Sequence, residues 1–147
     1  MRRHQHGSTL IEALAALLVF SIGILGLAAL NVSLVDQTTN AQLRAHATYL
    51  AEELLGLATA DVANIGCYTM TSSGPAACGS AVAQTAVANW RARVLAALPG
   101  ATATPPTVTY ADSGVDKGNL TVTLLWKRPH EPTQHNYVLT TNLYPDF

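Results

Sequence analysis

A continuous run of apolar residues dominates the hydrophobic pattern near the start of the chain. Residues 13–30 are 18 consecutive positions without a charged side chain. At about 1.5 Å of rise per residue, a helix of this length measures roughly 27 Å, close to the hydrocarbon thickness of a bilayer. The pattern therefore predicts a helix that is long enough to span a membrane.

Beyond residue 30 the pattern becomes amphipathic and stays helical. Apolar residues recur at three- and four-residue spacing at Leu43, Ala47, Leu50, Leu54 and Leu57, and polar residues gather at 36–42. No proline occurs between Ser8 and Pro75, so the sequence forces no break. We therefore predict one long helix over residues 8–60, ending between residues 57 and 60, with Gly56 weakening its last turns.

A second, shorter helix is expected over residues 81–98. Its apolar stripe consists of Val87, Trp90, Val94 and Leu98, with Arg91 and Arg93 pointing away from it, and Pro99-Gly100 stops it. An aromatic residue at helical spacing is more often a core residue than a ligand platform. We therefore expect Trp90 in the core.

The last third of the chain alternates between apolar and polar residues, as half-buried strands do. Strands are expected at residues 107–111, 120–126 and 137–143, with a turn at 112–119 and a proline-containing loop at 127–136. Three antiparallel strands packed on the upper half of the long helix would bury its second stripe. The predicted fold is therefore α+β: a long N-terminal helix, residues 8–60, with its membrane part at about 13–30, and a small head, residues 61–147, containing an antiparallel sheet and one short helix.

Cys67 and Cys78 bracket a stretch rich in turn-forming residues, which we expect to be a loop over residues 61–80. A metal site would need further ligands, and no His, Asp or Glu lies between the two cysteines. Redox chemistry usually shows a Cys-x-x-Cys spacing, which is absent here. In an exported domain the pair is expected to form a disulfide that closes the loop.

Composition and charge exclude several classes of function. The formal net charge is −1, so no basic face invites nucleic acid. Neither a glycine-rich phosphate loop nor a Gly-x-Ser-x-Gly nucleophile motif is present. His130, Glu131 and His135 form the one ligand-like cluster, and in a proline-containing loop we expect it to be solvated rather than metal-bound. We expect no enzyme activity, no cofactor and no metal.

The first seven residues are basic and free of acidic side chains, and Glu12 stands at the edge of the apolar run. Arg2 and Arg3 precede this run, and the next positive residue is Arg44, so the positive-inside rule leaves the leader cytoplasmic and exports the rest. A carboxylate near membrane depth is usually functional and usually has a partner.

The order Gly7, Ser8, Thr9-Leu10-Ile11-Glu12 and an apolar helix resembles the class III signal of type IV pilins and type II secretion pseudopilins. Ser8 stands where this family usually has Phe. The resemblance implies that a prepilin peptidase removes residues 1–7, cutting between Gly7 and Ser8, and methylates the amine of Ser8. It also implies that Glu12 pairs with the N-terminus of a neighbouring subunit.

The same resemblance implies the location and partners of the protein. A pilin-like subunit is held in inner-membrane lipid by a single pass, with a periplasmic head, and joins other minor and major pilins at the cell surface. The segment Trp90 to Gly100, ahead of a strand, resembles the corresponding region of minor pilins more loosely. A subunit of a tip or priming complex for pilus assembly is the expected function.

Other interpretations of the sequence stay open. Within the family, a minor pseudopilin of a type II secretion system has nearly the same signal. From a different class, a membrane-anchored periplasmic binding protein would use the region from Trp126 to Tyr137 as its surface. An ordinary cleaved signal peptide and an anchor left uncut at Gly7 are further alternatives, although the apolar run is longer than a usual signal core.

Overall fold

The computed structural model describes residues 8–112, 118–129 and 131–143. Contacts divide the chain into two compact units, residues 1–41 and residues 42–147, which we call the N-terminal unit and the head unit. Each is described by itself. The predicted leader, with Gly7, and the centre of the predicted turn at 112–119 lie outside the described residues.

Helix α1 extends from Ser8 to Ala60 without interruption, as the absence of proline predicted. Its end at Ala60 falls inside the predicted interval. In the apolar part, Ser21 Oγ donates a hydrogen bond of 2.7 Å to the carbonyl oxygen of Leu17, four residues earlier. This bond satisfies the hydroxyl within the helix itself, which a helix in lipid requires.

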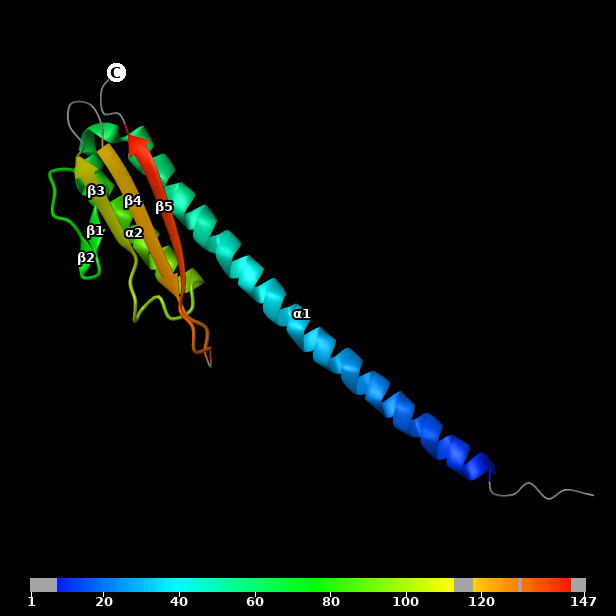
Figure 1. The fold of residues 1–147 in the computed structure, drawn as a ribbon. Coiled ribbons are helices and arrows are strands. Elements are labelled where there is room, and N and C mark those ends of the chain that lie inside the picture. Colours follow the sequence, from blue (N-terminus) through cyan, green and yellow to red (C-terminus); the bar gives the residue numbers. More distant parts are fainter. Residues whose placement is uncertain (1–7, 113–117, 130, 144–147) are drawn as a thin grey trace, which may run out of the picture. The chain divides into compact units, whose positions relative to one another are not determined.

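The head unit contains the end of α1, three-ten helix η1 (Val62–Tyr68), helix α2 (Ala81–Ala97) and five strands (Figure 1). The strands are β1 (Met70–Thr71), β2 (Gly74–Pro75), β3 (Thr107–Asp112), β4 (Gly118–Trp126) and β5 (His135–Leu143). They form one antiparallel sheet in the order β2-β1-β3-β4-β5. The long apolar helix, the small antiparallel sheet and the further helix confirm the predicted α+β class.

Strand β4 shows the alternation that its sequence predicted. Its inward residues Leu120, Val122, Leu124 and Trp126 are at most 1% exposed, and the residues between them are half-buried. Strand β5 begins two residues earlier than predicted, because His135 pairs with Trp126 at the start of a continuous register. Its inward face carries Tyr137, Leu139, Thr141 and Leu143, as expected.

One hydrophobic core joins the last turns of α1 to α2 and the sheet. Leu50 and Leu54 of α1 are buried, and Trp90 of α2 has no exposed surface. The indole N–H of Trp90 donates a hydrogen bond of 2.7 Å to the carbonyl oxygen of Leu50. A buried indole needs such a partner, so this contact fixes α2 against α1 and confirms Trp90 as a core residue.

The prediction of a plain loop at residues 61–80, and hence of three strands, was wrong. This stretch contains η1 and the two short strands β1 and β2. Met70 is 1% exposed and pairs with Val108 of β3, so tertiary pairing draws a turn-rich segment into the sheet. Gly74, at φ +144°, follows the tight Ser-Ser turn in a conformation that L side chains rarely adopt.

The disulfide expected between Cys67 and Cys78 is present in the structure, with 5.3 Å between the two Cα atoms. It joins the end of η1 to the segment before α2 and so closes the loop that holds β1 and β2. The chain-entropy model assigns about 2–3 kcal/mol to a cross-link over a loop of this size.

Gly100 ends the α2 region with φ +75°, and a Cβ there would lie 2.8 Å from the carbonyl oxygen of Lys127. We expect Gly100→Ala to lower the free energy of unfolding by about 1–3 kcal/mol, because it adds backbone strain and a contact with fixed backbone. The measurement is urea unfolding of the full chain in detergent, followed by tryptophan fluorescence.

Gly56→Ala is the matched control, because it lies in α1 and a Cβ there meets nothing within 4 Å. It should raise the free energy of unfolding by about 0.5–1 kcal/mol through helix propensity. Equal effects of the two substitutions would contradict the assigned strain at Gly100.

Candidate functional site

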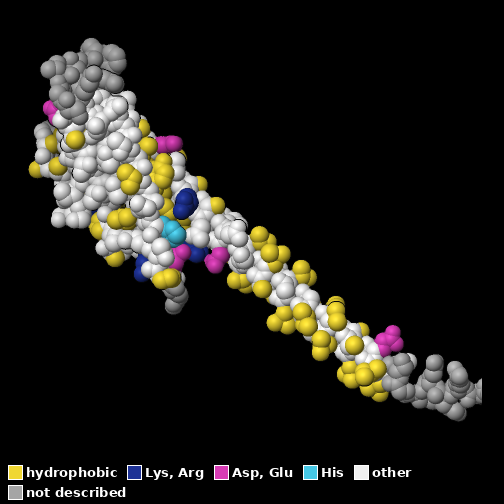
Figure 2. Space-filling model, in the orientation of Figure 1, with side chains coloured by type: hydrophobic (Ala, Val, Ile, Leu, Met, Phe, Trp, Pro, Cys, Tyr) yellow, Lys and Arg dark blue, Asp and Glu magenta, His cyan; other side chains and the backbone are white. Residues whose placement is uncertain are grey.

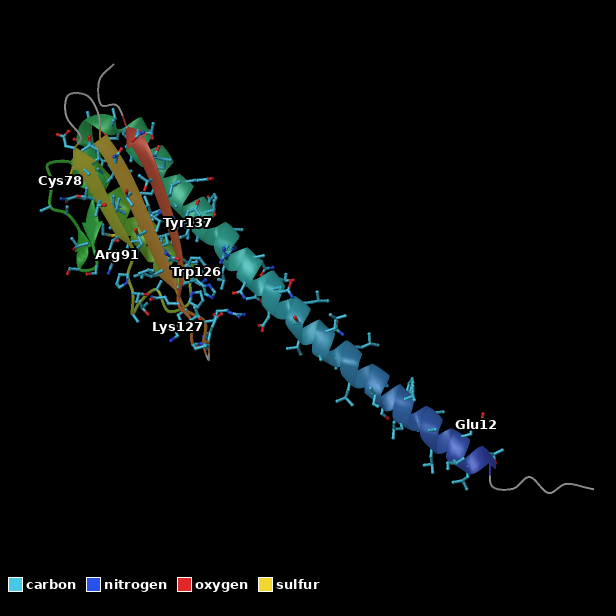
Figure 3. All side chains as sticks on the ribbon, viewed as in Figure 1. Glu12, Cys78, Arg91, Trp126, Lys127 and Tyr137 are labelled. Atoms are coloured by element: carbon cyan, nitrogen blue, oxygen red, sulfur yellow. A yellow bond between two sulfur atoms is a disulfide. The ribbon has the colours of Figure 1, made fainter. Side chains whose placement is uncertain are left out.

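The sequence placed the processing site at the start of the chain. Gly7 and the side chain of Ser8 lie outside the described part, and Ser8 is the first residue of α1. Glu12 lies in the second turn of the same helix and is exposed, with its carboxylate directed away from the helix axis (Figure 3). The structure therefore places the predicted glutamate on the surface of a regular helix, one turn after Ser8.

Apolar side chains surround Glu12 and continue along the helix. Every residue from Thr9 to Thr38 is exposed in the N-terminal unit. The large hydrophobic residues among them are 50–70% exposed: Leu10, Ile11, Leu14, Leu17, Leu18, Val19, Phe20, Ile22, Ile24, Leu25, Leu27, Leu30, Val32, Leu34 and Val35. Figure 2 shows them projecting from the helix on several sides. Covering such side chains stabilises a structure by about 1.5–3 kcal/mol each, so this surface requires lipid or protein around it.

Among the described residues, α1 is the one helix that is long and apolar enough to cross a membrane. Glu12 is the only charged residue between Ser8 and Val35. A carboxylate moved out of water into apolar surroundings is costly unless a cation or several hydrogen-bond donors accompany it. Glu12 therefore needs a cation or hydrogen-bond donors wherever lipid or protein surrounds this helix.

The ligand-like cluster of the last loop is an ion-pair network. Both oxygens of Glu131 are engaged: Oε2 accepts from Arg128 Nε at 3.2 Å, and Oε1 lies 2.9 Å from His135 Nε2. The hydrogen bonds from Arg128 and then His135 hold the pKa of Glu131 below its ordinary value. His130, the third predicted member, lies outside the described residues.

An aromatic contact anchors this network to the core. The ring of His135 stacks on Trp126, with 5.6 Å between ring centroids and 18° between planes. Within the described residues, no three His, Cys, Asp or Glu side chains come together as a metal site. The arrangement braces the loop between β4 and β5 and offers no nucleophile next to a base.

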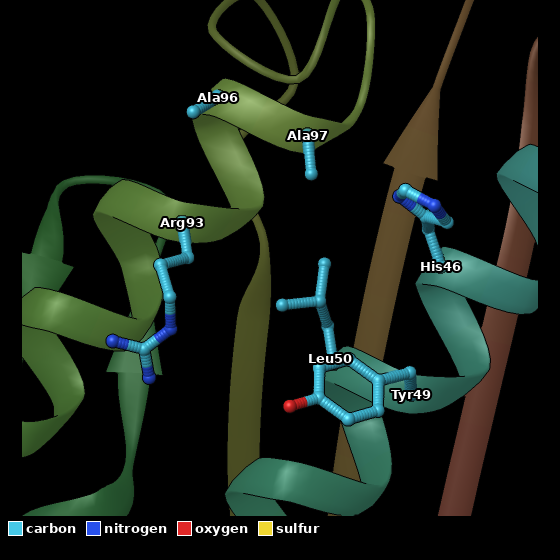
Figure 4. A pocket seen from close by; sticks show the side chains of 6 residues that line it. All are labelled: His46, Tyr49, Leu50, Arg93, Ala96 and Ala97. Carbon is cyan, nitrogen blue, oxygen red and sulfur yellow. The ribbon is translucent and has the colours of Figure 1, made fainter.

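A groove of about 540 Å³ lies between the last part of α1 and α2. Its lining is His46, Tyr49, Leu50, Arg93, Ala96 and Ala97, and Figure 4 shows these side chains from the two helices. The floor is apolar, and Arg93 forms an ion pair with Glu53 of α1. The sequence did not reveal this pair, because 40 residues separate its members.

A second groove, of about 650 Å³, lies beside the braced loop, near Lys127 in Figure 3. It is lined by Pro99, Gly100, Ala103, Thr104, Lys127, Arg128, Pro129, Pro132 and Gln134. This groove occupies part of the Trp126 to Tyr137 region that the binding-protein interpretation used. Its lining contains no catalytic pair of residues.

Comparison with known protein families gives one match. Residues 2–28 match the model of the prokaryotic N-terminal methylation motif. The chain carries this motif. The match covers the leader, Glu12 and most of the apolar run, which are the residues that suggested the pilin-type signal. Searches of curated proteins and of solved structures returned no match.

The methylation motif is typical of type IV pilin-like and pseudopilin proteins. Proteins with this motif are structural rather than enzymatic. The motif implies processing by a prepilin peptidase and assembly with other pilins, and together with the apolar helix it suggests membrane anchoring. The head unit lies outside the matched residues, so its role rests on its own geometry.

Because its pKa is lowered in the folded state, Glu131 stabilises the head at pH values above the ordinary glutamate pKa. This contribution is lost as the pH falls through the folded-state value. We expect Arg128→Ala to raise the pKa of Glu131 toward its ordinary value, since the largest cause of the shift is removed. A carboxyl-detected NMR titration measures this pKa directly.

The control is Lys127→Ala, which removes the exposed cation next to Arg128 in the sequence. Lys127 does not contribute to the shift in the pKa of Glu131. It should leave the titration of Glu131 unchanged. A pKa of Glu131 that is the same in Arg128→Ala as in the unmodified protein would contradict the assigned cause.

Proposed function

We propose that this protein is a minor pilin, a structural and assembly subunit of a type IV pilus, acting in a tip or priming complex that initiates assembly. The observation that carries the proposal is a lone carboxylate, Glu12, on a helix whose apolar side chains are exposed on all sides, directly behind a methylation motif. Such a helix is suited to two environments in succession, lipid and a bundle of like helices.

Processing is the first step of the proposed mechanism. A prepilin peptidase cuts between Gly7 and Ser8 and methylates the new amine of Ser8. The mature chain then crosses the inner membrane once, through about residues 13–30, and holds residues 61–147 in the periplasm as a disulfide-bonded head. The two arginines of the leader support this orientation, because positive residues are retained on the cytoplasmic side.

Assembly is the second step. On extraction into a filament, the apolar helix exchanges lipid contacts for contacts with neighbouring helices. Glu12 then pairs with the cationic amine of Ser8 on an adjacent subunit, which relieves the desolvation of both charges and fixes the axial register of the helices. The same amine lies one turn from Glu12 on its own helix, a spacing at which opposite charges attract each other, so the carboxylate has a cation before assembly as well.

Three features of the sequence favour a minor over a major pilin. Ser8 replaces the usual Phe, Ala29 stands where many major pilins have a proline, and the Trp90 to Gly100 segment resembles the minor pilin PilV. The structure supports the first part of that segment as a core helix, α2, which ends at Ala97, three residues before Gly100. Such subunits bear on adhesion or motility through the filament that they start.

The second candidate is a minor pseudopilin of a type II secretion system, similar to GspI. The methylation motif at residues 2–28 favours it equally, because both classes carry this signal. A membrane-anchored binding protein is the third, and the groove beside Lys127 is the surface it would use. Genes for pilus or secretion components next to this one would separate the first two.

The intact mass of the protein extracted from the membranes of its own host tests processing. We expect a chain that begins at N-methylated Ser8. Gly7→Ala should block the cut and leave a chain that begins at Met1, still in the membrane. A wild-type chain that begins at Met1 would reduce the protein to an uncut anchored domain, and one that begins after Leu30 would make it a secreted soluble protein.

Glu12→Ala tests assembly. We expect the variant to be cut, to stay in the membrane and to unfold like the wild type. The number of filaments per cell and the incorporation of the variant into filaments should fall to background, because the amine of Ser8 on the adjacent subunit loses the carboxylate that pairs with it. Electron microscopy of sheared filaments with immunoblotting measures both. Glu52→Ala, at an exposed glutamate of α1 in the head unit, is the control and should assemble normally. Normal incorporation of Glu12→Ala would exclude the proposed pairing.

A further inference from the structure

The two edges of the sheet differ in how they are protected. One edge is β2, which has two residues and includes Pro75, a residue without an N–H group. The other edge is β5, which has nine residues and pairs with β4 in a continuous register without a bulge. Proteins usually blunt an edge strand by making it short or by placing proline, a bulge or charged residues on it. The β2 edge is blunted in this way, and the β5 edge is not.

The side chains of β5 add no barrier to strand pairing. The strand His-Asn-Tyr-Val-Leu-Thr-Thr-Asn-Leu contains no Lys, Arg, Asp, Glu or Pro. Its outward residues are exposed and uncharged, with Val138 at 51%. Alternate residues of an edge strand direct both the N–H and the C=O away from the sheet. Within the described residues, no strand takes up these groups on β5.

The hydrophobic layer under the sheet also stops unfinished at β5. The inward side chains of β4 are at most 1% exposed, whereas Tyr137 and Leu139 on β5 contact the core but remain half-buried. A further strand with apolar residues at alternate positions would cover them. The open backbone edge and the partly exposed apolar rim formed by Tyr137 and Leu139 therefore point to the same missing element.

We propose that the outer edge of β5 docks an extended, uncharged segment of a neighbouring protein, with apolar side chains at alternate positions, which adds to the sheet as a further strand. Main-chain hydrogen bonds supply the attachment, and the rim formed by Tyr137 and Leu139 selects the apolar side chains. A charged segment is rejected, because β5 offers no opposite charge and the rim would desolvate it.

A second copy of this chain paired β5 to β5 fits this edge less well. An antiparallel pair would reverse one head unit against the other, so their α1 segments 42–60 would run in opposite senses. Helix α1 is continuous from Ser8 to Ala60, so two such helices that start in one membrane run in the same sense and do not form that pair. The occupant is therefore a segment of a different protein. The exclusion of a second copy rests on the membrane anchoring in the proposed function, and the rest of the inference does not.

The test uses the full chain in detergent and a fluorescent synthetic peptide, Asn-Leu-Thr-Val-Thr-Leu-Leu. This peptide copies residues 119–125 of β4 and has the required alternation without charge. We expect saturable binding by fluorescence anisotropy, and binding weakened by about tenfold or more when proline replaces the central valine of the peptide. Hydrogen exchange should show new protection at alternate amides of β5.

Two protein variants locate the site. Thr140→Lys places a charge on the exposed face of β5 and should weaken peptide binding by about tenfold or more. Thr109→Lys is the matched control, because Thr109 is an exposed threonine on β3, away from the edge; it should bind like the wild type. The urea midpoints of both variants show whether the head unit is folded.

Three results would overturn the proposal: no binding of the alternating peptide, equal binding by Thr140→Lys and wild type, or protection that falls outside β5. Concentration-dependent dimers of the wild type that Thr140→Lys abolishes, without peptide, would make a second copy the occupant and reject the partner we assign. Because the assay needs neither leader cleavage nor filaments, its failure leaves the proposed pilin function standing, and failed processing leaves this test intact.

Discussion

The structure depends first on a constraint of solvent: the apolar surface of α1 between Leu10 and Val35 cannot remain in water. A globular protein would bury one stripe of such a helix in its own core, as the head unit does with Leu50 and Leu54. The N-terminal unit buries none of it. Lipid or other helices must therefore surround this surface. This requirement explains the presence of the leader, the methylation motif and Glu12.

The head unit meets a different constraint, that of holding a small sheet in place. The core is modest, and three local devices assist it: the Trp90 to Leu50 hydrogen bond, the Cys67–Cys78 disulfide and the network around Glu131. Each fixes a segment that hydrophobic contact alone would leave loosely defined: α2, the β1–β2 loop and the β4–β5 loop. The edge of β5 is the one long boundary of the described sheet without such a device.

The features that the sequence predicted are those with a repeating pattern. The unbroken apolar run predicted α1, and the alternation of apolar and polar residues predicted β4 and β5. The apolar stripe that ends before Pro99-Gly100 predicted α2. The features that it missed have no period. β1 is two residues long and exists because Met70 pairs with Val108, far along the chain. The Glu53–Arg93 ion pair likewise joins residues 40 positions apart, which local spacing cannot reveal. The His135–Glu131 spacing was visible, but the role of Arg128 in occupying that carboxylate was not.

Under the proposed function, the order of events at the candidate site follows from charge alone. Before cleavage, Arg2 and Arg3 hold the start of the chain at the cytoplasmic face, because moving them through lipid costs several kcal/mol. Cleavage after Gly7 removes both arginines and creates one amine, the backbone nitrogen of Ser8. The helix then carries one cation and one anion, Glu12, at a spacing of one turn, and its end is neutral as a whole. A neutral apolar helix can leave the membrane for a bundle, and once there each carboxylate can exchange its own amine for that of a neighbour. Processing therefore has to precede assembly.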